Sequence, residues 1–133
     1  MIFIFENFTY EKLDREEAEE LTEIINTGAS DLSEYLLFHL KVVDSTIEEL
    51  TTEDNSLVQT SAIKCMLETV FLAKKVITLI EQKKATIKIT SSESESILIN
   101  AKALINGVEK VAELNKKHML EVEPSELLVY LVV

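Results

Sequence analysis

Residues 57–82, LVQTSAIKCMLETVFLAKKVITLIEQ, decide the fold because they are apolar around most of a helical circumference. Their apolar side chains recur at the three- and four-residue steps of an α-helix. This stripe comprises Ala62, Ile63, Met66, Val70, Ala73, Val76, Ile77 and Ile80, and is widened by Cys65, Leu67, Phe71, Leu72 and Leu79. Charged residues interrupt the stretch, so it lacks the run of about 20 apolar residues that a membrane span needs. We therefore predict a central helix that is covered on nearly every side.

The length and composition of the chain favour a single helix-rich domain. A chain of 133 residues can bury a proper core without disulfides, and we expect residues 1–133 to form one globular domain. Two glycines and one proline favour long regular elements over many short strands. The one cysteine and the absence of a secretory signal at the N-terminus favour the cytoplasm.

Negative charge is concentrated in the first two-fifths of the sequence. Residues 1–54 hold 15 acidic and three basic side chains, whereas residues 55–133 hold nine acidic side chains and ten lysines. Such a segment repels phosphates, so we expect no direct binding of nucleic acid. The expected partner is a basic protein surface, including that of a nucleic-acid-binding protein. The alternative is that these acids only keep an apolar protein in solution.

Residues 13–40 have the pattern of a second long helix. Asp14 is the expected N-cap, and Glu16 and Glu17 suit the positive end of the helix dipole. Gly28 lies inside the pattern, where glycine costs roughly 1 kcal/mol relative to alanine. It therefore marks a break in the helix, a close helix contact or a functional turn.

Carboxylates recur every three or four residues on the outer face of this second helix. Residues at these spacings are neighbours on a helix surface, about 5 to 6 Å apart, so they would form an acidic ridge that imitates a row of phosphates. The predicted partner-binding residues are Glu16, Glu20, Glu23, Asp31 and Glu34.

The remaining segments predict strands and a third helix. Residues 1–6, 119–123 and 127–133 have the pattern of strands, and residues 85–90 alternate as a half-exposed strand. Residues 42–50 form either a strand or an extended segment. Residues 97–117 predict the third helix, preceded by a capping box of Ser92 and Glu95. The expected fold class is α+β, with three long helices packed on a small sheet formed by both termini and the strand near 85–90.

The sequence contains none of the familiar catalytic, nucleotide-binding or metal-binding motifs. We therefore expect no cofactor and no metal site. The leading functional hypothesis is a non-enzymatic acidic protein that binds and inhibits or regulates a basic partner, as small inhibitors, immunity proteins and nucleic-acid mimics do. A further alternative is a structural homo-oligomer that associates through the 57–82 helix.

Residues 13–50 also resemble the phosphatase helix of the CheC-type chemotaxis proteins. That helix carries Asp or Ser, then Glu four residues on, then Asn three residues later, followed by a Gly-Ala pair. Here Glu23, Asn26, Gly28 and Ala29 match this pattern, and Glu19 stands where Asp or Ser is expected. The resemblance implies an enzyme that dephosphorylates a response regulator, with Glu23 contacting the regulator and Asn26 orienting the attacking water.

Overall fold

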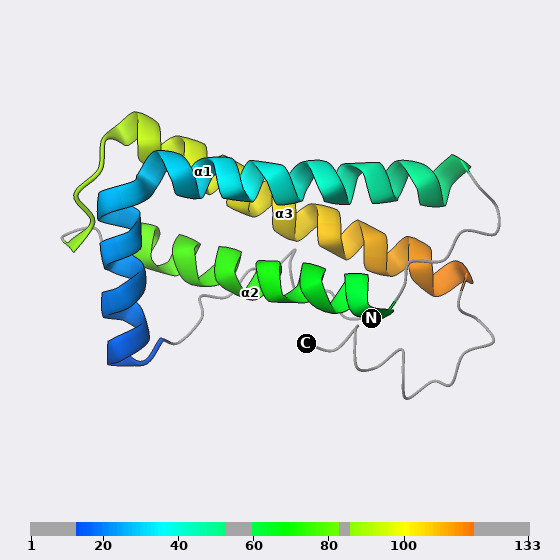
Figure 1. Cartoon of the computed structure of the whole chain (residues 1–133), viewed down its shortest axis with the longest axis horizontal. Coiled ribbons are helices and arrows are strands. Elements are labelled where there is room, and N and C mark those ends of the chain that lie inside the picture. The colour runs from blue at the N-terminus through cyan, green and yellow to red at the C-terminus, as the bar shows by residue number, and fades with distance from the viewer. Residues whose placement is uncertain (1–12, 53–59, 83–85, 119–133) are drawn as a thin grey trace.

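The computed structural model describes residues 13–52, 60–82 and 86–118. Three helices form a bundle, α1 (Arg15–Thr52), α2 (Thr60–Gln82) and α3 (Ser91–His118). The longer part of α1 and α3 run in the same direction, and α2 returns antiparallel to both (Figure 1). The described residues contain no strand, so the expected α+β fold is wrong and this part of the chain is all-α. The predicted terminal strands at 1–6, 119–123 and 127–133 lie outside the described residues.

Residues 42–50, which were expected to be extended, continue α1 without interruption. Val43 and Leu50 are buried in the same core as Leu36, and Ile47 packs against it. These positions follow one another at three-, four- and seven-residue steps, which is a helical period. The alternative of a strand failed because the apolar pattern of this segment continues the inner stripe of the residues before it.

The segment before α3 is not the strand that its alternation predicts. Residues 87–90 have no regular secondary structure, although Ile87 and Ile89 both pack against the core as expected of an inward face. Within the described residues no neighbouring strand pairs with this backbone. Its polar groups find a side chain instead: the Asn26 amide donates through Nδ2 to the Thr86 carbonyl at 2.9 Å, and Asn26 Oδ1 accepts from the Lys88 N–H at 2.6 Å.

Residues 60–82 form the predicted helix, α2, but it is not the central one: α3 packs against both α1 and α2, whereas α1 and α2 contact each other least. The side chains of α2 from Val76 to Ile80 are all buried, and Ala73 is fully enclosed. Burying an Ile or Leu side chain contributes roughly 1.5–3 kcal/mol, so this helix supplies a large share of the core. Ser61, Lys64 and Glu68 form an exposed polar strip, as expected, but Cys65 is also exposed and does not belong to the packed stripe.

Gly28 breaks α1, which confirms one of the three roles expected of it. Its φ of −141° and ψ of 41° are non-helical, and the helix changes direction there. The first arm of α1, residues 15–27, crosses the end of the bundle near the C-terminus of α2, and the second arm, residues 29–52, runs along α3 (Figure 1). A salt bridge of 2.8 Å between Lys75 Nζ and Glu17 Oε2 joins the first arm to α2.

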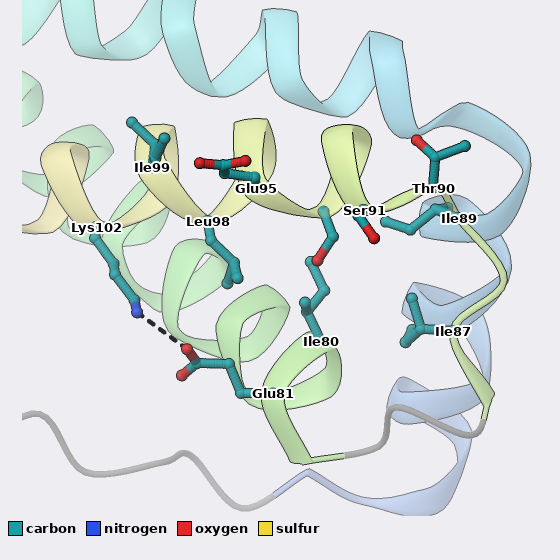
Figure 2. A pocket seen from close by; sticks show the side chains of 11 residues that line it. Ile80, Glu81, Ile87, Ile89, Thr90, Ser91, Glu95, Leu98, Ile99 and Lys102 are labelled. Carbon is teal, nitrogen blue, oxygen red and sulfur yellow. Dashed lines mark hydrogen bonds and ion pairs between the residues drawn. The ribbon is translucent and has the colours of Figure 1, made fainter.

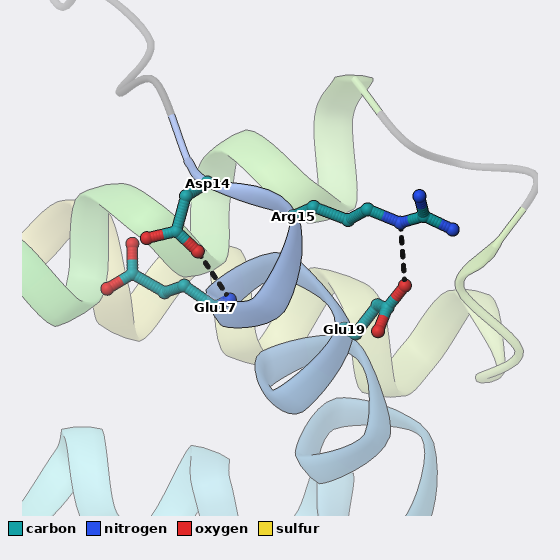
Figure 3. A network of polar contacts seen from close by, with 4 residues as sticks. All are labelled: Asp14, Arg15, Glu17 and Glu19. Carbon is teal, nitrogen blue, oxygen red and sulfur yellow. Dashed lines mark hydrogen bonds and ion pairs between the residues drawn. The ribbon is translucent and has the colours of Figure 1, made fainter.

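Two side-chain caps define where helices begin. The Glu17 N–H donates to Asp14 Oδ1 at 2.8 Å, so the predicted N-cap of α1 is confirmed (Figure 3). The capping box of α3 consists of Thr90 and Glu93, not Ser92 and Glu95. The Thr90 N–H donates to Glu93 Oε1 at 2.9 Å, and the Glu93 N–H donates to Thr90 Oγ1 at 3.1 Å. Both pairs fit the same four-residue motif, and the earlier pair places the start of α3 six residues before the predicted position.

The second arm of α1 and α3 approach each other closely. A Cβ atom added to Gly107 would lie 2.8 Å from Val43 Cγ1, so this glycine is a contact point between the helices. Farther along the interface, the hydroxyls of Ser33 and Ser96 are 2.7 Å apart, and Asn100 Nδ2 donates to Ser33 Oγ at 3.1 Å. This pairing fixes the direction and register of the two helices.

Candidate functional site

The predicted acidic residues all lie on the surface of α1. They are Glu16, Glu20, Glu23, Asp31 and Glu34, and each is exposed. In the described part of the chain, none of these five carboxylates forms an ion pair with a cation. The break at Gly28 separates the first three, on the first arm, from the last two, on the second arm. The acids therefore occupy two surfaces at an angle to each other, not one straight ridge.

Other acids at the beginning of α1 have structural roles. Glu17 forms the salt bridge to Lys75, and its backbone N–H is capped by Asp14. Glu19 Oε1 lies 3.2 Å from Arg15 Nε, an exposed pair at four-residue spacing (Figure 3). Such exposed pairs contribute little to stability. The sequence alone does not single out Glu17, because its partner Lys75 lies on α2 and is 58 positions away.

The second arm of α1 carries an apolar patch that the sequence analysis missed. Of the six large apolar side chains exposed in the described residues, four lie between positions 35 and 42. Tyr35, Phe38 and Val42 are 45%, 59% and 43% exposed, and their three- and four-residue spacing aligns them on one side of the helix. His39 packs its ring between those of Tyr35 and Phe38, with centroids 4.5 and 5.3 Å away.

Asp31 and Glu34 lie on the same side of the helix as this patch. Asp31 precedes Tyr35 by four residues, and Glu34 precedes Phe38 by four, so each carboxylate is one turn from an exposed ring. We call Asp31, Glu34, Tyr35, Phe38 and Val42 together the outer patch of α1. A partial signal was present in the sequence, since Phe38 and Val42 fall outside the buried stripe of Leu32, Leu36 and Val43.

Glu19, Glu23 and Asn26 line a cavity of about 840 Å³ between the first arm of α1, the end of α2 and Thr86, together with apolar side chains such as Leu13 and Leu79. Glu23 is exposed, but both ends of the Asn26 amide are bonded to backbone groups of residues 86 and 88. A residue that orients an attacking water needs a free donor or acceptor aimed at that water. The observed role of Asn26 is to hold the segment before α3 against α1.

A second pocket lies between the end of α2, residues 87–91 and the beginning of α3 (Figure 2). Its volume is about 590 Å³, and its walls include Ile80, Ile87, Ile89 and Leu98. An ion pair of 3.0 Å between Lys102 Nζ and Glu81 Oε2 lies at its rim. The lining is mixed, since it also includes Thr90, Ser91 and Glu95.

The described residues contain no group of three His, Cys, Asp or Glu side chains that could hold a metal ion. None of the helices in this part of the chain is long and apolar enough to cross a membrane. No protein-family model, no curated protein and no solved structure matches this chain. The surface of α1 therefore has to be interpreted from its own chemistry.

Proposed function

We propose that this chain is a non-catalytic binding protein whose acidic α1 surface recognises a basic partner protein and blocks or regulates it. The observation that carries the proposal is the charge of this helix. Residues 13–52 hold eleven acidic and two basic side chains, whereas the described residues of α2, α3 and the segment between them hold six acidic and eight basic ones. The field of the molecule is therefore strongly negative on one side.

The free carboxylates suit this role because they are available without breaking internal ion pairs. A negative surface accelerates encounter with a cationic partner and disfavours nucleic acid and acidic proteins. An inhibitor, an immunity-type protein and a nucleic-acid mimic all work in this way, by covering a cationic surface. The single cysteine, Cys65, suits a reducing compartment, so we propose a cytoplasmic location.

The test is capture from a nuclease-treated cell lysate with two charge-reversed variants. One variant carries Glu16→Lys, Glu20→Lys and Glu23→Lys, and the other carries Asp31→Lys and Glu34→Lys. We expect the wild-type protein to retain a basic protein that at least one of these variants loses. Retention is also expected to fall in ~1 M salt, where the Debye length is only about 3 Å.

The matched control carries Glu95→Lys and Glu113→Lys, two exposed acids of α3. It changes the net charge as much as the Asp31 and Glu34 reversals do, but on another helix. If both α1 variants retain the same proteins as the wild type and this control, the acids only solvate the protein and the proposed function is wrong.

A further inference from the structure

The outer patch of α1 combines two kinds of recognition chemistry in about three turns of helix. Single exposed apolar residues are ordinary on protein surfaces, but an aligned group with flanking charges indicates an interaction site. Phe38 is the most exposed large apolar side chain of the described residues at 59%, and Tyr35 and Val42 flank it on the same side. Phe38 points away from the buried stripe of α1, so a ligand there would add to the outside of the bundle.

The shape of the patch favours a helix as its ligand. Side chains at three- and four-residue steps form a ridge that fits the groove of another helix, and amphipathic helices bind such surfaces through an apolar stripe of the same spacing. The described residues offer no sheet edge to which an extended peptide could add as a strand. Backbone pairing is therefore not available at this surface, and side chains must supply the affinity.

The charges beside the patch determine the charge of the ligand. Asp31 and Glu34 lie one turn before the exposed rings and are not neutralised by any described cation. We propose that the outer patch of α1 binds a basic amphipathic helix of the partner protein, whose apolar stripe covers Phe38 and Tyr35 and whose Lys or Arg side chains pair with Asp31 and Glu34. This inference rests on the proposed function and names its partner more closely.

The experiment uses two synthetic peptides of about 18 residues, five helical turns, with the same Leu and Lys content. One places Leu at three- and four-residue steps, and the other has the same residues in an order that forms no apolar stripe. Binding to the full chain is measured by calorimetry at low salt. We expect the first peptide to bind at least tenfold more tightly than the second.

Matched variants locate the binding site. Phe38→Ala and Tyr35→Ser are each expected to raise the Kd of the first peptide about tenfold, since buried aromatic anchors dominate such interfaces. Ile99→Ala on α3 is the apolar control, because Ile99 is 58% exposed, and it should leave the Kd within twofold. Asp31→Asn with Glu34→Gln should also weaken binding about tenfold, and Glu95→Gln with Glu113→Gln should not. Circular dichroism confirms that each variant keeps its helices.

Three results would overturn the inference. Equal binding of both peptides, weakened only by the charge variants, would show that the surface selects charge and not a helix, and would leave the proposed function intact. No binding of either peptide, together with lysate capture that still depends on the α1 acids, would show a partner of another shape. A dimer in sedimentation velocity that Phe38→Ala dissociates would show that a second copy of the chain covers the patch.

Discussion

At the scale of single residues, Asn26 shows how one side chain can replace a missing strand. Its amide offers a donor and an acceptor side by side, as an extended backbone does, and the backbone of residues 86 and 88 bonds to both. Asn26 was visible in the sequence, but the backbone groups that it bonds lie about 60 positions away. A local pattern therefore predicted the inward direction of Ile87 and Ile89 and could not predict what pairs with their backbone.

We expect Asn26→Ala to lower the free energy of unfolding by about 1–2 kcal/mol, because it removes two hydrogen bonds that are each worth about 0.5–1.5 kcal/mol. Urea denaturation measures this loss, and hydrogen exchange at the Lys88 amide should become faster. Asn106→Ala, at an exposed position of α3, is the control. Equal stability of the two variants would contradict the role assigned to Asn26.

The same variant tests the phosphatase interpretation. We expect neither the wild type nor Asn26→Ala to accelerate loss of phosphate from the aspartate of a response regulator, because the backbone of residues 86 and 88 fixes the orientation of the amide. Faster hydrolysis by the wild type than by an equally folded variant would instead favour the CheC-like phosphatase hypothesis.

At the scale of helices, the apolar periodicity was sufficient to predict most of the bundle. The helix at 60–82 and the N-cap at Asp14 could be derived from the sequence, and the break at Gly28 was one of three roles expected there. The end of α1 could not, since residues 42–50 carry apolar residues on two sides: Val43 and Leu50 face the core and Val42 is exposed. That double-sided pattern imitates a strand, and the same exposed side forms part of the candidate site.

The two glycines should respond in opposite ways to alanine. Gly107→Ala is expected to lower the free energy of unfolding by about 1 kcal/mol or more. Its Cβ would overlap the stiff, buried Val43 side chain, and this steric cost exceeds the roughly 1 kcal/mol gain in helix propensity. A Cβ at Gly28 would meet nothing within 4 Å, so Gly28→Ala should be neutral or stabilising by up to about 1 kcal/mol. Thermal and urea unfolding give both values. A Gly107→Ala protein more stable than Gly28→Ala would rule out the close α1–α3 contact.

At the scale of the whole molecule, charge is distributed unevenly over a compact core. The net charge of the chain is −11, and the excess lies in the part that contains α1. Repulsion among like charges opposes the compact state, and salt screens it. The sequence shows this asymmetry directly and offers a break at Gly28 as one possibility, but the direction of the bend and the exposure of Tyr35 beside Asp31 emerge only from the three-dimensional arrangement.

Raising NaCl from ~10 mM to ~0.3 M should therefore raise the Tm by a few degrees, which corresponds to about 1 kcal/mol for a domain of this size. Differential scanning calorimetry measures the change. A variant with Glu16→Gln, Glu20→Gln and Glu23→Gln should start from a higher Tm at low salt and gain less from added salt. A salt response that is the same in both proteins would show that these carboxylates do not oppose folding.

The contact between Ser33 and Ser96 has a consequence for how the chain folds. These residues are 63 positions apart, and the helices that carry them run in the same direction. Neighbouring helices joined by a short turn can meet early. The Ser33–Ser96 contact closes a long loop, and the chain loses the conformational entropy of that loop before the contact can stabilise it. The α1–α3 interface therefore belongs to the late, non-local stage of folding, and a nascent chain that ends after α2 lacks the surface that would bury the inner stripe of α1.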